Sequence, residues 1–203
     1  MEIIEIITRL GITGFPLILF SVIAFSLFLE RSLFFFVHRA QSKKVEQLVS
    51  EHLSRSSIYA FDKLKQMNSP LAKVAHVQIK NIHLPKELHC EIVEEEGRQQ
   101  LAQLTAKLPT LSTIAQTAPL LGLLGTVLGL VSAFYQIETM GTVQPQDLAG
   151  GIWEALLTTV AGLTVGIPSL LSYQFFKNRS KKLALEMSRT SVWIKKTMAD
   201  IKG

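Results

Sequence analysis

One uncharged stretch of the sequence decides the fold: Leu108–Ile137, which reads LPTLSTIAQTAPLLGLLGTVLGLVSAFYQI. It holds 30 residues without Asp, Glu, Lys or Arg, whereas a helix needs only about 20 apolar residues to cross the hydrocarbon core of a bilayer. Two more stretches share this character: Leu10–Leu29, with no charge, and Leu148–Phe176, with Glu154 as its single charge. The sequence therefore predicts an all-α membrane protein with three transmembrane helices.

The composition agrees with this class. Of the 203 residues, 18% are charged, against roughly 25% in an average soluble domain. The single cysteine, Cys90, excludes an internal disulfide and a cysteine-based structural zinc site. His83 and His89 are six residues apart with Pro85 between them, so one helix face does not present both. We therefore predict no metal site and no cofactor.

The distribution of Lys and Arg predicts the topology. The connector 138–147 has none, and the tail 177–203 has eight: Lys177, Arg179, Lys181, Lys182, Arg189, Lys195, Lys196 and Lys202. Because positive loops stay in the cytoplasm, the tail is predicted to be cytoplasmic, and the connector and the N-terminus external. The predicted segments are an external N-terminus with the first span (1–37), a cytoplasmic helical region (38–107), the second span (108–137), the periplasmic connector (138–147), the third span (148–176) and the basic cytoplasmic tail (177–203).

The cytoplasmic parts also look helical. Helices are predicted over Ala40–Gln66, over Leu71–Ile82, and from near Glu87 through Lys107 towards the second span. We expect the third span to continue into the tail as one long helix. The tail carries an apolar stripe at spacings typical of a helix face; its members are Leu183, Met187, Ile194, Met198 and Ile201. The stripe is predicted to be a packing face, with recognition of another protein as the alternative.

Glu154 is the most informative membrane residue. It lies six residues inside the third apolar stretch, or about 9 Å at 1.5 Å per residue. An ionisable group inside a membrane costs on the order of 3 kcal/mol and usually faces a bundle interior or a water-filled path. The alternative is an interfacial carboxylate that reaches back to external water.

Threonines from two spans are predicted to share one depth. Thr158 and Thr159 lie about 15–17 Å inside the third span, and Thr126 lies about 17 Å inside the antiparallel second span. Hydroxyls, water and a titrating carboxylate can pass a proton between them. At 100° per residue, Thr158 lies about 40° and Thr159 about 140° from Glu154 around the helix. This predicts two polar faces, of which one could meet a neighbour in a ring of identical subunits and the other line a central space.

Small residues and prolines complete the pattern. The spans carry glycines that favour close helix packing, and two pairs of them have small-xxx-small spacing, Gly125 with Gly129 and Gly162 with Gly166. The packing glycines are Gly122, Gly125, Gly129, Gly162 and Gly166. Pro119 and Pro168 each leave a backbone carbonyl without its usual donor and can bend their helices.

These residues give the chain a family resemblance. It resembles the MotA/TolQ/ExbB proton-channel family, the ExbB branch first and the TolQ branch second. The similar stretches are Ala118–Val127 (APLLGLLGTV), Gly151–Thr159 (GIWEALLTT) with Gly162–Pro168 after it, Pro16–Leu19 (PLIL) with Leu29–Arg31, and Ser69–Ala72 (SPLA).

The resemblance implies an inner-membrane subunit, five copies of which surround two copies of a single-span partner of the ExbD/TolR type. Protons would pass inward past a partner aspartate near the threonines, and the force would act on a TonB- or TolA-like protein. By position, Glu154 matches the family's third-helix glutamate, and Thr126 and Thr159 match its pore threonines. Thr158 would belong to a secondary pathway.

The sequence leaves alternatives to an ExbB-like motor. A TolQ-like role in envelope maintenance is the nearest, and a non-conducting membrane scaffold is a different class. An intramembrane enzyme is disfavoured because the spans hold no nucleophile–base pair or metal-ligand cluster. Nucleic-acid binding is not predicted either, because topology and anionic lipid headgroups account for the basic tail.

Overall fold

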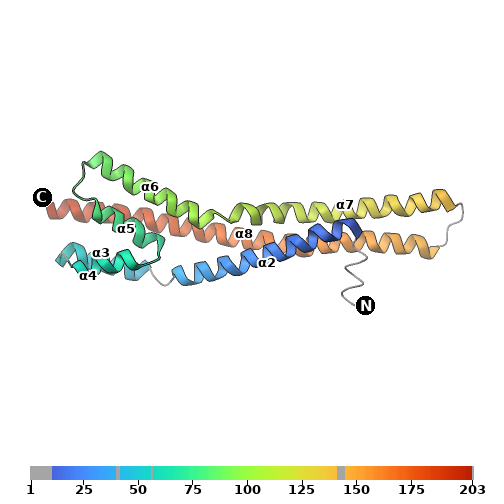
Figure 1. The fold of residues 1–203 in the computed structure, drawn as a ribbon, viewed down its shortest axis with the longest axis horizontal. Helices are drawn as coiled ribbons and strands as arrows, with labels where there is room; N and C mark the ends of the chain where they lie inside the picture. Colours follow the sequence, from blue (N-terminus) through green and yellow to red (C-terminus); the bar gives the residue numbers. More distant parts are fainter. Residues whose placement is uncertain (1–10, 40–41, 56, 141–144, 203) are drawn as a thin grey trace. The chain divides into compact units, whose positions relative to one another are not determined.

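The computed structural model describes residues 11–39, 42–55, 57–140 and 145–202, and the elements that it defines there are all helices (Figure 1). They are α2 (Gly11–Arg39), α3 (Ser42–Arg55), α4 (Ile58–Gln66), α5 (Pro70–Lys80), α6 (Lys86–Thr105), α7 (Leu108–Met140) and α8 (Pro145–Lys202). Among these residues, three stretches are long and apolar enough to cross a membrane, within Thr13–Val37, Lys86–Thr139 and Ala149–Ala199. The predicted all-α class and the three apolar helices are confirmed.

Helix α8 runs without interruption for 58 residues. The prediction that the third span continues into the tail is therefore correct. Pro168 lies inside this helix; it cannot donate to the carbonyl four residues before it, but the surrounding turns stay helical.

The single helix predicted over Ala40–Gln66 is wrong. The structure has two helices there, because α3 ends at Arg55 and α4 begins at Ile58. Ser57 adopts an extended backbone, and its hydroxyl accepts a hydrogen bond from the Ala60 backbone N–H at 3.3 Å. This N-cap pairs a backbone N–H that has no partner in the first turn of a helix. Ser57 therefore marks the start of α4 within the stretch predicted as one helix.

A second break separates α6 from α7 at residues 106–107. The expected helix from Glu87 therefore ends at Thr105. Pro109 has no N–H to donate to the Thr105 carbonyl, which is the bond that a continuous helix would need there. Helix α5 starts at Pro70, a residue favoured in a first helical turn, close to the predicted start at Leu71.

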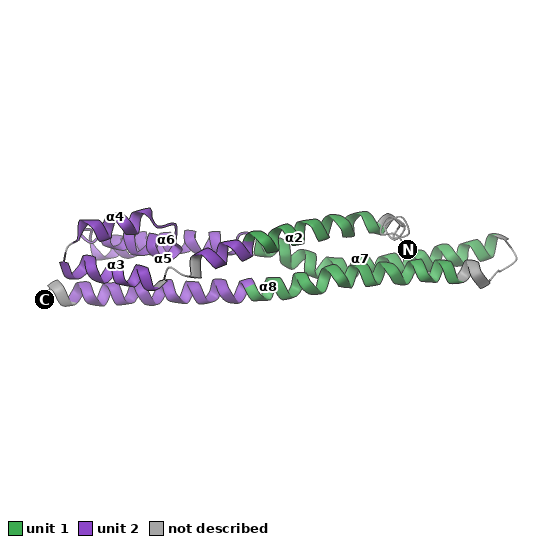
Figure 2. Cartoon of the chain, turned by 90° about the horizontal axis from the view of Figure 1, so that it is seen from below, with its two compact units in different colours: residues 1–30, 107–175 green, residues 31–106, 176–203 purple. Residues whose placement is uncertain are grey.

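The helices form two compact units (Figure 2). Unit 1 contains residues 1–30 and 107–175, and unit 2 contains residues 31–106 and 176–203. In unit 1 many large apolar side chains on α2, α7 and α8 are exposed, as expected for helices that meet lipid or further protein.

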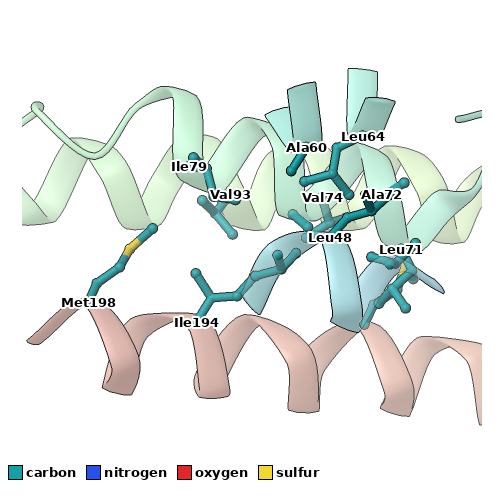
Figure 3. Packing of buried hydrophobic residues seen from close by; sticks show 14 of the residues in the cluster. Leu48, Ala60, Leu64, Leu71, Ala72, Val74, Ile79, Val93, Ile194 and Met198 are labelled. Atoms are coloured by element: carbon teal, nitrogen blue, oxygen red, sulfur yellow. The ribbon is translucent and has the colours of Figure 1, made fainter. Parts of the chain in front are cut away.

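Unit 2 has a core of its own, to which α3, α4, α5, α6 and the end of α8 contribute (Figure 3). Met187, Ile194 and Met198 of the predicted stripe are buried in it, and Leu183 packs against it. The packing face on the tail is thus confirmed for these four residues, whereas Ile201 lies outside the side chains described.

Buried polar groups fix the helices of unit 2 to one another. The Gln78 side chain on α5 is fully buried, and its Nε2 donates to the Ser191 carbonyl on α8 at 2.9 Å. The Gln78 carbonyl accepts from His89 Nε2 on α6, also at 2.9 Å. Because each bond joins different elements, α5 is connected to both α6 and α8.

Candidate functional site

The site in unit 1 is centred on one backbone carbonyl. Thr158 Oγ1 lies 3.1 Å and Thr159 Oγ1 lies 3.2 Å from the Gly122 carbonyl oxygen on α7. Thr158 Oγ1 also lies 2.7 Å from the Ala155 carbonyl of its own helix. Two neighbouring hydroxyls of α8 therefore converge on a single acceptor in α7.

This convergence corrects the prediction of two separate polar faces on the third helix. The Cα directions of Thr158 and Thr159 differ by about 100°, but both side chains turn towards α7 and meet the same oxygen. The reason is the short distance between the helices, which lets residues on either side of the contact line reach one carbonyl.

Glycine makes that approach possible. A Cβ added at Gly122 would lie 2.8 Å from the Thr158 carbonyl oxygen and 3.0 Å from Thr159 Cα. A Cβ at Gly162 would lie 2.6 Å from the Ala118 carbonyl oxygen. Real Cβ atoms do not come so close to backbone, so any larger residue at either position would push α7 and α8 apart.

The remaining glycines of the pattern also lie at contacts between helices. A Cβ at Gly129 would lie 2.9 Å from the Ala155 Cβ, and one at Gly166 would lie 2.6 Å from Pro119 Cγ. Pro119 of α7 thus packs against Gly166 of α8 and fills the space that the missing side chain leaves.

Pro168 borders a cavity of about 280 Å³ between α2 and α8. Hydroxyls from both helices line it, together with Phe25 and Phe28; they belong to Ser21, Thr164, Ser169 and Ser172. Ser169 and Ser172 donate to carbonyls of their own helix, each at 2.7 Å. This satisfies their protons in an apolar surrounding.

Thr126 and Glu154 do not share the Gly122 acceptor. Thr126 Oγ1 donates to the Leu123 carbonyl of its own helix at 2.6 Å. Glu154 is half-buried on α8, four residues and about one turn before Thr158. A half-buried carboxylate is compatible with both interpretations, a group on a polar path and an interfacial carboxylate.

The family model of the MotA/TolQ/ExbB proton channel family matches residues 58–189. This chain belongs to the MotA/TolQ/ExbB proton channel family. The match contains Gly122, Thr126, Glu154, Thr158 and Thr159. The chain is thus a multi-pass membrane protein of a channel family, as the resemblance implied.

Individual relatives fall in two branches of this family. Biopolymer transport protein ExbB of Neisseria meningitidis is 28% identical over 185 residues, with 84% of this chain and 83% of the relative covered. An ExbB-like biopolymer transport protein of Synechocystis is 32% identical over 173 residues, covering 83% and 81%. The Tol-Pal system protein TolQ of Pseudomonas aeruginosa is 40% identical over 81 residues, covering 40% and 35%.

Sequence reasoning missed one residue at this site, Thr13 of α2. It is only 5% exposed, and a Cβ added at Gly125 would lie 2.7 Å from its hydroxyl oxygen and in contact with that of Thr158. Thr13 lies outside the residues that the family model matches. The one available signal was a hydroxyl next to a glycine, Gly14, in an apolar segment, which is too common to single out a site.

His89 and Cys90 of unit 2 each contact another group. His89 donates to the Gln78 carbonyl, and Lys195 Nζ lies 3.3 Å from Cys90 Sγ. Within the described part of the chain, no group of three metal-ligating side chains comes together.

Proposed function

We propose that this chain is the channel-forming subunit of an inner-membrane proton motor of the ExbB type. With a single-span partner of the ExbD/TolR type, it would convert the proton motive force into work on a TonB-like protein for outer-membrane uptake. The observation that carries the proposal is the convergence of Thr158 and Thr159 on the Gly122 carbonyl, in a chain of a proton channel family.

The proposed pathway uses Thr126, Glu154 and Thr159, with Thr158 as a secondary member. Glu154 takes up and releases the proton, since it is the one carboxylate of the third apolar stretch. A threonine hydroxyl can donate its proton and accept another, so it passes the proton on without a lasting charge. Each proton that crosses supplies about 2.3 kcal/mol per 100 mV of membrane potential.

The proposed assembly is a homo-oligomer, a ring of five subunits around the partner helices. Exposed apolar side chains on α7 and α8 support an assembly or lipid contact along unit 1, because such surfaces are unfavourable in water. The Lys and Arg distribution supports a periplasmic N-terminus and a cytoplasmic tail. The segments 1–37, 38–107, 108–137, 138–147, 148–176 and 177–203 keep their proposed places in this topology, although residues 141–144 of the connector lie outside the described part.

Proton flux through the purified complex tests the channel role. We expect Glu154→Gln to abolish proton uptake into proteoliposomes under an imposed potential. Thr159→Val should lower it about tenfold, the factor for one lost hydrogen bond of about 1.4 kcal/mol. The matched control is Thr164→Val, because Thr164 is an exposed threonine of α8 that donates to its own helix.

Normal flux in both variants, with normal assembly, would support the non-conducting scaffold instead. A scaffold organises its partners without moving protons, so loss of the Glu154 carboxylate would leave its function intact.

A TolQ-like role is the second candidate. The specific observation in its favour is the 40% identity to a TolQ protein over 81 residues. Isolation of the complex from native membranes in mild detergent, followed by mass spectrometry, separates the two roles. A TonB-like component would support uptake, and a TolA-like component would support envelope maintenance.

A further inference from the structure

Two helices of unit 1, α2 and α8, bring hydroxyls to one glycine of α7. Thr13 of α2 is 5% exposed, and Thr158 of α8 is 4% exposed. Both hydroxyl oxygens border Gly125 of α7, where an added Cβ would touch each of them. Gly125 therefore provides the space that both side chains border, much as Gly122 does for Thr158 and Thr159.

The buried position of Thr13 requires an explanation. A hydroxyl moved from water into an apolar interior costs on the order of 1–3 kcal/mol unless it is hydrogen-bonded. Valine has the same shape and carries no such cost, so packing alone favours valine at this position. Thr13 is thus better explained by its hydroxyl than by its volume.

The Thr158 hydroxyl oxygen can accept hydrogen bonds in addition to donating its own proton. Its hydroxyl has one proton, and the carbonyls of Gly122 and Ala155 both lie within reach of it. One proton serves one of these acceptors at a time, and the oxygen keeps two lone pairs that can accept. The Thr13 hydroxyl oxygen borders the same position at Gly125 as that oxygen does.

We propose that Thr13 is a further relay residue of the proton pathway and that it acts together with Thr158. This inference rests on the proposed channel function and adds α2 to the helices that carry the pathway. In the relay, one hydroxyl oxygen accepts a proton as its own proton passes to the next oxygen. Each threonine therefore ends the step neutral, and no other reactant is needed.

The test compares Thr13→Val with Thr13→Ser in the complex purified with its native partner. Valine keeps the shape and removes the hydroxyl, whereas serine keeps the hydroxyl. We expect proton uptake into proteoliposomes to fall about tenfold in Thr13→Val, the factor for one lost hydrogen bond, and to stay within about twofold of wild type in Thr13→Ser. Ser26→Ala is the control, because Ser26 is an exposed hydroxyl of the same helix.

Two results would overturn the proposal. One is wild-type flux in Thr13→Val; the other is an equal loss in the serine and valine variants with normal assembly, which would mean that shape and not the hydroxyl matters. If Thr13→Val does not accumulate, Thr13→Ala carries the same comparison, and flux at or above that of Thr13→Ser contradicts a relay.

Glu154→Gln in the same preparation separates this inference from the channel function. If Glu154→Gln loses flux and Thr13→Val does not, the relay role fails and the channel stands. If both variants conduct normally, the channel role fails as well.

Discussion

At Arg31, a full positive charge is satisfied by backbone carbonyls. Its side chain is 4% exposed, and Nη1 lies 3.0 Å from the Leu104 carbonyl and 3.3 Å from that of Gln103. Both carbonyls belong to the last turn of α6, where carbonyl oxygens have no N–H donor within the helix and carry partial negative charge. Ser180 Oγ of α8 also lies 3.4 Å from the Leu104 carbonyl. Arg31 therefore stabilises the end of α6 inside unit 2.

We predict that Arg31→Met destabilises the protein by about 2–3 kcal/mol, because buried carbonyls lose a charged donor. The measurement is the thermal unfolding midpoint of the full chain in detergent. Arg98→Met is the control, since Arg98 is exposed and its ion pair with Glu95 is screened by water, so its loss should have little effect. Equal shifts of the unfolding midpoint in the two variants would show that the buried contact of Arg31 contributes no more to stability than the exposed ion pair of Arg98.

At the scale of elements, the contact between α7 and α8 depends on backbone proximity. Gly122 and Gly162 face each other closely enough that a Cβ at Gly162 would lie 3.0 Å from Gly122 Cα. Without side chains between them, the helices bring threonine hydroxyls of one to a carbonyl of the other. The polar cluster is thus a consequence of how tightly two helices pack.

Gly162→Ala and Gly150→Ala should have opposite effects, although both glycines lie in α8. At Gly162 the new Cβ meets the Ala118 carbonyl at 2.6 Å, so the helices must separate at a cost of about 1–3 kcal/mol. At Gly150 nothing lies within 4 Å, and alanine should be neutral or stabilise by up to about 1 kcal/mol through its helix propensity. Unfolding midpoints in detergent measure both, and a stabilised Gly162→Ala variant would contradict the close packing.

At the scale of the whole molecule, the two units are stabilised by different means. Unit 1 has few large buried side chains and many exposed apolar ones, as fits helices that meet lipid. Unit 2 has an apolar core with buried polar cross-links such as Gln78 to Ser191. Within unit 2, the His76 and Phe61 ring centroids are 4.7 Å apart.

Burial, followed by the nearby ammonium groups of Lys80 and Lys65, holds the pKa of His76 below its usual 6.5; Asp62 and Glu96 oppose this shift. The folded chain thus favours the neutral ring. As pH falls below about 6.5, the unfolded chain binds a proton that the folded chain does not, and stability decreases until pH passes the lowered pKa.

We predict a lower unfolding midpoint at pH 5 than at pH 8, with a smaller difference in His76→Gln. His83→Gln is the control, because His83 is exposed after α5. A pH dependence that is unchanged in His76→Gln, or reduced equally in His83→Gln, would assign the effect to other groups.

The sequence by itself determined the class of the fold. Three long apolar stretches with one internal charge predict membrane helices. In lipid, a helix pairs the backbone N–H and C=O groups of such a stretch within the stretch itself. The stripe at Met187, Ile194 and Met198 likewise predicted a continuous helix with a buried face, since its period is that of a helix. Hydrophobic periodicity did not predict two helix boundaries. Ser57 caps the start of a new helix, and Pro109 lacks the N–H that a continuous helix would need between α6 and α7.

Only the tertiary structure decided which hydroxyls meet. Angles around one helix placed Thr158 and Thr159 on different faces, and nothing in the first apolar stretch related Thr13 to Gly125. The physical reason is that helix rotation and register depend on the small residues of the partner helix. Those glycines set how close α7 and α8 come, and that distance brings two threonines to one carbonyl and a third from α2 beside them.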